Sequence, residues 1–89
     1  MTAALSPEVL QDPVAVSLGY AVTTANKQAR ELGINVQESI LTISQYAANG
    51  SQVWRINYGP KDYVGRRGGD LIVEVDPSDA TVKRVLHGQ

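Results

Sequence analysis

The chain has 89 residues, of which 43% are hydrophobic and 19% are charged, and its formal net charge at pH 7 is −1. These values are typical of one small globular domain, and they exclude the overall basic charge that non-specific nucleic-acid binding requires. No apolar run approaches the roughly 20 residues that a membrane-spanning helix needs, so no membrane partner is expected. The absence of cysteine excludes a disulfide framework and a thiolate site.

The first residues of the chain carry little hydrophobic periodicity. Residues 1–11 include Pro7 and are predicted to form a flexible N-terminal arm or a short turn of helix, whereas residues 12–89 are predicted to form a single domain. The residues after Met1 lack the basic and apolar regions of a secretory signal peptide. If Met1 is the native start, we therefore expect a cytoplasmic protein.

A helix is predicted over residues 13–32. The Asp12 carboxylate can accept hydrogen bonds from the free N–H groups of the first turn, and Pro13 suits the first helical position. Gly33 can supply the left-handed backbone that often follows a helix. Apolar residues recur at helical spacing and form one stripe, which consists of Val14, Leu18, Ala21, Val22, Ala25, Ala29 and Leu32. The small side chains in this stripe would let the helix lie close to a sheet.

Four strands are predicted after the helix, because apolar and polar residues alternate in four short segments. These segments are residues 38–46, 52–58, 70–76 and 81–87. Asn49-Gly50 predicts a tight turn between the first two strands, and Pro77–Ala80 predicts a turn between the last two. The run KRVL breaks the alternation in the last strand, where a bulge could re-aim Val85 or Leu86.

Together these elements predict an α+β fold, in which one N-terminal amphipathic helix packs on a four-stranded antiparallel meander sheet. Trp54 is in phase with Ile56 and Tyr58, which predicts that it packs beneath the helix on the same side of the sheet as Leu71. The expected sheet side of the core consists of Leu41, Ile43, Trp54, Ile56, Leu71, Val73, Val75 and either Val82 or Val85.

Two short runs in the second half of the chain resemble a known kind of domain. They are VWRINY, at residues 53–58, and GGDLIVEVDPSDATVKRVLHG, at residues 68–88. They resemble the terminal hairpin of PepSY-type domains, and they are similar to the small nuclear-transport-factor-like immunity proteins of bacterial toxin systems. The resemblance implies a cystatin-like helix-on-sheet module without catalytic residues, of the kind found in regulators and inhibitors of peptidases or toxins. The turn after Asp76 departs from the PepSY pattern because it contains no glycine.

Residues that could carry catalysis or bind a metal are few. His87 is the only histidine and lies near the end of the chain, so neither a metal site nor a nucleophilic triad is expected, and no cofactor is predicted. Glu74 and Asp76 form a carboxylate pair that a hydrolase could use if one of them lay in an apolar pocket. We interpret them instead as solvent-facing charges opposite Arg55 or Lys83 on neighbouring strands.

The stretch Gly59–Gly69 contains GRRGG and is longer than an ordinary hairpin loop. A phosphate cradle is not expected there, because the glycines lead into a strand rather than into a helix N-terminus. Long loops often carry binding function, and tyrosine and arginine are enriched at interface hot spots. The partner-binding candidates for an acidic protein surface are therefore Lys61, Tyr63, Arg66 and Arg67, together with Arg55 on the outer sheet face. The alternative is a solvated hairpin tip.

From the sequence we expect a non-catalytic protein-binding module, of the peptidase-inhibitor or toxin-immunity kind. The alternative is an enzyme or small-ligand carrier with a pocket between helix and sheet, but a domain of this size can hardly fill its core and also leave such a pocket. The first strand has no charge between Ile40 and Tyr46, so an edge there could pair two copies. We expect a monomer or a weak homodimer.

Overall fold

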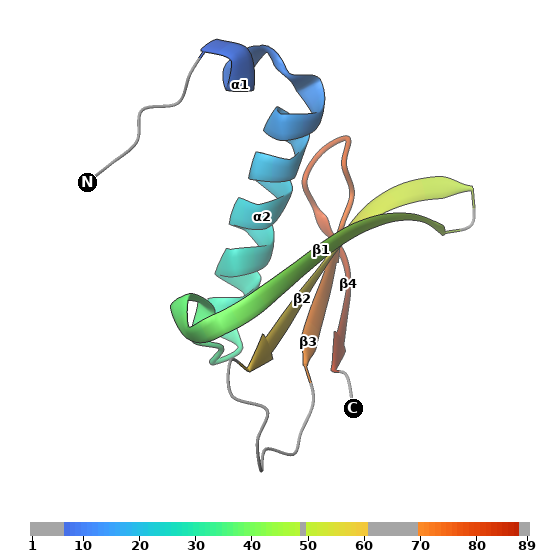
Figure 1. Ribbon diagram of the computed structural model, residues 1–89. Helices are drawn as coiled ribbons and strands as arrows, with labels where there is room; N and C mark the ends of the chain where they lie inside the picture. The colour runs from blue at the N-terminus through green and yellow to red at the C-terminus, as the bar shows by residue number, and fades with distance from the viewer. Residues whose placement is uncertain (1–6, 49, 61–69, 88–89) are drawn as a thin grey trace.

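The computed structural model describes residues 7–48, 50–60 and 70–87, and Figure 1 shows their arrangement. A long helix lies against a four-stranded antiparallel sheet with the strand order β1-β2-β3-β4. The elements are α1 (Pro7–Gln11), α2 (Pro13–Glu31), the 3₁₀ helix η1 (Val36–Glu38), β1 (Ser39–Ala48), β2 (Ser51–Pro60), β3 (Leu71–Val75) and β4 (Val82–His87). The predicted α+β fold, with its helix on a meander sheet, is confirmed.

Helix α2 begins and ends where the sequence predicts. The Asp12 side chain caps it by accepting hydrogen bonds from the backbone N–H groups of Val14 and Ala15, at 2.9 and 3.1 Å. Leu32 closes the helix, and Gly33 has a φ of +88°, which glycine adopts without the steric cost of a Cβ. The chain therefore leaves α2 sharply and turns back through η1 into the sheet.

The sheet consists of two hairpins, β1–β2 and β3–β4, which are joined by the pairing of β2 with β3. β1 and β2 pair without interruption from Ser39 opposite Pro60 to Ala48 opposite Ser51. β3 pairs with β2 on one side and with β4 on the other. The register between β3 and β4 shifts at Glu74 and Val75, because Lys83 is an extra residue in β4. The predicted bulge in the last strand is thus confirmed.

The turn between β3 and β4 contains no glycine and is held by side chains. The Asp76 carboxylate accepts hydrogen bonds from the backbone N–H and the hydroxyl of Ser78, at 2.8 and 2.6 Å. Asp79 makes the same pair of contacts with Thr81, at 3.1 and 2.7 Å. Ala80 adopts a φ of +57°, a left-handed conformation that a glycine would fill more easily. The two Asx turns therefore compensate for the missing glycine.

The core lies between α2 and the two central strands. Ala21, Ala25 and Ala29 are fully buried, so α2 can lie close to the sheet. The sheet contributes Trp54, Ile56, Tyr58, Leu71, Val73 and Val75, with both Val82 and Val85 packed against their edge.

Two polar contacts fix the register of the helix on the sheet. The Trp54 indole N–H donates to the Ser17 hydroxyl at 3.0 Å, which confirms that Trp54 lies beneath α2. The Tyr58 hydroxyl donates to the Asn26 side chain at 2.6 Å, and burial raises the pKa of Tyr58 to about 12.

Three predicted core residues are more exposed than expected. Val14 and Leu32 lie at the two ends of α2, and both are exposed because the helix is longer than the sheet surface that it covers. Ile43 points to the helix side of the sheet but is 39% exposed, because α2 packs mainly on β2 and β3. On β1, Leu41 is partly buried and packs against the core. Figure 1 shows the turn end of the β1–β2 hairpin extending away from α2.

No helix in the described part of the chain is long and apolar enough to span a membrane.

Candidate functional site: the outer face of the sheet

The face of the sheet that points away from α2 carries a group of charged and polar side chains. Successive side chains of a strand alternate between the two faces, so the residues between the core positions point outward. On β2 these are Val53, Arg55 and Asn57, and on β3 they are Ile72 and Glu74. β1 contributes Tyr46 beside them, and the bulge in β4 places Arg84 opposite Glu74. No helix of the described residues covers this face (Figure 1).

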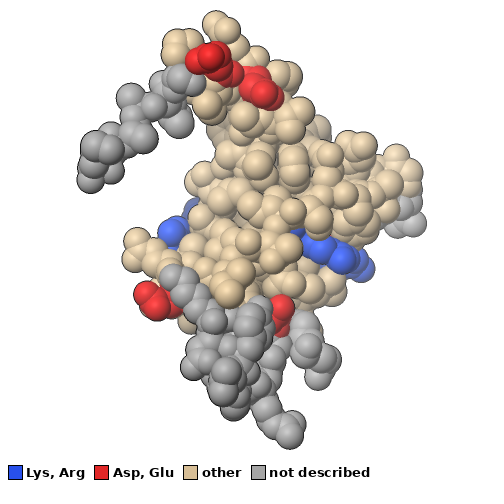
Figure 2. Space-filling view, viewed as in Figure 1, with Lys and Arg blue, Asp and Glu red and all other residues tan. Residues whose placement is uncertain are grey.

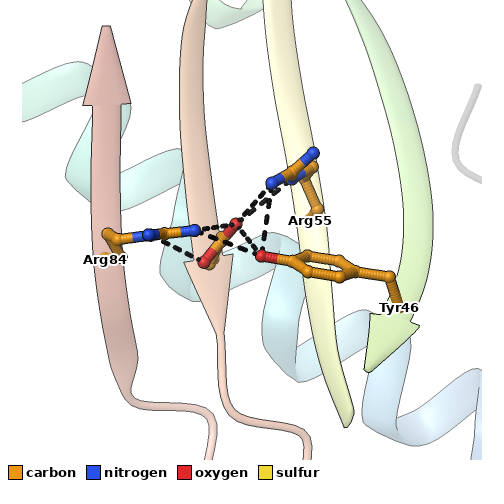
Figure 3. A network of polar contacts seen from close by, with 4 residues as sticks. Tyr46, Arg55 and Arg84 are labelled. Atoms are coloured by element: carbon orange, nitrogen blue, oxygen red, sulfur yellow. Dashed lines mark hydrogen bonds and ion pairs between the residues drawn. The ribbon is translucent and has the colours of Figure 1, made fainter. Parts of the chain in front are cut away.

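Glu74 is the centre of the group. Its side chain receives hydrogen bonds from three strands, and Figure 3 shows Tyr46, Arg55 and Arg84 converging on its carboxylate. Arg55 donates from Nε and Nη2 to Oε2, at 3.2 and 2.9 Å. Arg84 donates from Nε to Oε1 at 3.1 Å and from Nη2 to Oε2 at 3.2 Å, and the Tyr46 hydroxyl donates to Oε2. We call these four residues the Glu74 cluster.

The residues that surround Glu74 also contact one another. The Tyr46 hydroxyl accepts hydrogen bonds from Nη2 of Arg55 at 3.2 Å and from Nη2 of Arg84 at 3.3 Å. The Arg55 guanidinium carbon lies 4.4 Å from the centroid of the Tyr46 ring, a distance typical of a cation–π contact. Each arginine is therefore hydrogen-bonded to both Glu74 and Tyr46, which fixes its guanidinium group in one orientation.

The electrostatics of Glu74 follow from two opposing effects. Glu74 is only 3% exposed, and burial acts to raise the pKa of its carboxyl. Hydrogen bonds from Arg84, Tyr46 and Arg55 favour the charged form and lower the pKa to about 2. The hydrogen bonds to Glu74 in turn raise the pKa of Arg55 and of Arg84. All three groups therefore stay ionised at neutral pH.

The two arginines remain accessible although Glu74 is buried. The Arg55 and Arg84 side chains are 37% and 54% exposed. Two guanidinium groups against one carboxylate leave the cluster with an excess of one positive charge. Nε and Nη2 of each arginine already donate to Glu74 and Tyr46, so Nη1 is the nitrogen of each guanidinium that could donate to a carboxylate or another anion.

Among the partner-binding candidates that the sequence singled out, the structure places one in this cluster. Arg55 donates to the Glu74 carboxylate from the outer face of β2, as its predicted position requires. Lys61, Tyr63, Arg66 and Arg67 lie outside the described residues. Glu74 faces Arg55 as predicted, but the expectation that it faces solvent is wrong, because Tyr46 and the two arginines cover it. Asp76 does not join it and instead pairs with Lys83 at 3.5 Å, near the sheet edge.

Tyr46 and Arg84 were not singled out from the sequence. Arg84 could be found only by knowing that Lys83 forms the bulge, since a regular ladder would turn Arg84 to the other face. Tyr46 lies on β1, two strands away from Glu74, and reaches it across β2. The alternation of apolar and polar residues within one strand cannot predict a contact between side chains two strands apart.

Next to the cluster on β2, Asn57 Oδ1 is buried and has no hydrogen-bond partner among the described residues. The same residues contain no group of three or more histidine, cysteine, aspartate or glutamate side chains that could hold a metal ion. The Glu74 carboxylate is ionised and hydrogen-bonded to Tyr46, Arg55 and Arg84, so it is not a free carboxyl. The partly exposed guanidinium groups are the part of this cluster that could contact an anion.

Comparison of the chain with protein-family models, with curated proteins and with solved structures found no match. The resemblance to PepSY-type domains and to immunity proteins therefore stays a prediction.

Proposed function

We propose that this chain is a non-catalytic protein-binding module, and that its outer sheet face binds an acidic segment of a partner protein at the Glu74 cluster. One observation carries the proposal. The guanidinium groups of Arg55 and Arg84 lie on a sheet face that no described helix covers. The buried Glu74 carboxylate holds both in a fixed orientation, and more than a third of each arginine side chain stays exposed.

The fixed orientation matters because a free arginine loses rotamer entropy when it binds. An arginine whose Nε is already hydrogen-bonded loses less, so more of the interaction free energy is available for the partner. Arginine and tyrosine are also among the residues enriched at interface hot spots. The described part of the face thus combines pre-organised donors, an aromatic ring and a local positive charge.

An acidic protein segment fits this surface better than a nucleic acid does. The net charge of the chain is −1, so the long-range attraction that nucleic-acid binding needs is missing, and one local excess charge favours a short carboxylate-bearing segment. The predicted resemblance would make the partner a peptidase or a toxin. Arg66 and Arg67, which were predicted from the sequence, would extend the same charge preference.

The proposal can be tested by NMR titration of the labelled protein with short oligoglutamate and oligolysine peptides. We expect oligoglutamate to shift amide signals around Arg55, Glu74 and Arg84, and oligolysine to leave them unchanged. Arg84→Ala should weaken oligoglutamate binding about tenfold at low salt, because hydrogen bonds to charged groups are among the stronger ones. Arg84→Lys should weaken it less, since it keeps the charge but loses the fork.

Lys27→Ala is the matched control, because it removes one exposed positive charge from α2 on the other side of the sheet. It should leave binding within about twofold, as long-range charge effects are small and screened. Equal weakening by Lys27→Ala and Arg84→Ala would show that only net charge matters and would rule out a site at the cluster. Loss of binding in Arg66→Ala/Arg67→Ala alone, with Arg84→Ala unaffected, would move the site to the predicted loop.

A further inference from the structure

The two edges of the sheet differ in how well they are protected against pairing with another strand. β1 is ten residues long, and all ten pair with β2 in an unbroken register. Strands of five or six residues are more usual. β1 is the first strand in the sheet order, so no described strand pairs with the backbone groups along its other edge.

Edges are commonly protected by charged side chains, by proline or by a bulge. β4 has two of these devices, because it carries Lys83 and Arg84 and is bulged at Lys83. The segment SILTISQYAA of β1 has none of them. Figure 2 shows that the surface where β1 crosses the molecule is largely free of charged side chains. The sheet therefore has one protected edge and one open edge.

Side chains on both faces of β1 are also only partly covered. Ile40 points to the outer face and is 42% exposed, whereas Ile43 points to the helix side and is 39% exposed. α2 does not reach far enough to cover Ile43, since it packs mainly on β2 and β3. A further strand beside β1 would bury apolar surface on both faces at once.

We propose that the strand that pairs with β1 is β1 of a second copy of this chain, in an antiparallel pair about a two-fold axis at Ile43. This register places Ile43 opposite its own copy. It places Ile40 opposite the second copy's Tyr46, and Thr42 opposite its Ser44.

A second copy fits better than an arbitrary strand for two reasons. First, a two-fold pair places identical residues next to each other near the axis, so charged residues there would repel their own copies. β1 is uncharged throughout. Second, two residue pairs match in polarity, because Ile40 lies opposite an aromatic ring and Thr42 lies opposite another hydroxyl, whereas Leu41 lies opposite Gln45. The result is a continuous eight-stranded sheet. Each copy contributes one α2 helix, and both helices lie on the same face of this sheet.

The test is sedimentation equilibrium over a range of protein concentrations. The wild-type chain should show a reversible monomer–dimer equilibrium. Ile43→Lys and Ile43→Glu should each reduce the association constant at least about tenfold, because like charges then face each other at the axis. Ile43→Thr is the control, since it keeps an uncharged β-branched residue and should retain most of the association.

Mixing the two charged variants provides the decisive measurement. Opposite charges then face each other across the axis, so the mixture should dimerise although each variant alone does not. This rescue also shows that both variants are folded. A wild-type chain that stays monomeric at high concentration would overturn the proposal, and so would charged variants that dimerise as the wild type does or a mixture that shows no rescue.

Discussion

Glu74 shows how a single residue can be both buried and charged at modest cost. A buried carboxylate is unfavourable unless its oxygens are hydrogen-bonded and its charge is paired. Here both oxygens accept hydrogen bonds, and two guanidinium groups supply the opposite charge. The three donors come from β1, β2 and β4, so the contacts tie all four strands together across the outer face.

The lowered pKa of Glu74 makes stability depend on pH. The folded-state pKa is about 2 and the ordinary value is 4.5, so this carboxylate contributes about 3 kcal/mol of stability that is complete above pH 4.5 and is lost as the pH falls towards 2. We expect Glu74→Gln to unfold more easily than the wild type at pH 7, and the difference to shrink between pH 4.5 and 2. Urea unfolding at a series of pH values measures this.

The exposed carboxylate of Glu31 at the end of α2 offers a matched control. Glu31→Gln should change the free energy of unfolding by no more than about 0.5 kcal/mol at pH 7. A constant difference between Glu74→Gln and the wild type across the whole pH range would mean that the loss comes from packing rather than from the charge.

At the scale of elements, α2 depends on the small size of the side chains beneath it. Ala21, Ala25 and Ala29 are one turn apart and fully buried, so the helix backbone lies close to the sheet. We expect Ala25→Leu to lower the free energy of unfolding by about 1–3 kcal/mol, because the larger side chain must push α2 away from the core. Thermal or urea unfolding measures the change.

Thr23→Leu is the corresponding control on the exposed side of α2. It introduces the same side chain without a packing conflict, so its effect should stay within about 0.5 kcal/mol. If Ala25→Leu were equally mild, the space between α2 and the sheet would be larger than the buried alanines indicate.

The elements themselves could be predicted from local pattern, because capping, turn residues and hydrophobic period all act over a few positions. Asp12 and Gly33 marked the ends of α2, and alternation marked all four strands. The prediction that failed was which side chains α2 buries. Ile43 has the pattern of a core residue, but its burial depends on where α2 crosses the sheet, and the crossing is set by long-range packing. Tyr46 and Arg84 of the Glu74 cluster were missed for the same reason, since the four members of the cluster come from four strands.

At the scale of the whole molecule, stability should be distributed unevenly across the sheet. β2 and β3 lie in the centre beneath α2, whereas β1 is an edge strand on which α2 packs much less. We expect amide hydrogen exchange in β1 to be at least about tenfold faster than in β2 and β3 at low protein concentration. Exchange followed by NMR would show this, and equal protection of β1 and β2 in a dilute monomer would contradict it.

Dimerisation through β1 would also bring two copies of the Glu74 cluster onto one surface. Arg55 lies on β2, so the two copies of this residue would be separated by the spacing of three strands, about 14 Å. An acidic segment that reached both clusters would bind with higher overall affinity, because its second contact would be intramolecular. The proposed dimer and the proposed function would then reinforce each other.

The bulge at Lys83 limits how far such an assembly could grow. Without Lys83, β4 would alternate regularly, with Val82 and Val85 on the helix side and Arg84 on the outer face, and the fold could persist. The edge of β4 would then be straight and able to pair with β1 of a neighbour, in a head-to-tail arrangement that never closes. In the proposed dimer, the extra residue in the last strand would thus act together with the charge of Arg84 to stop the assembly at two copies rather than let it polymerise into fibres.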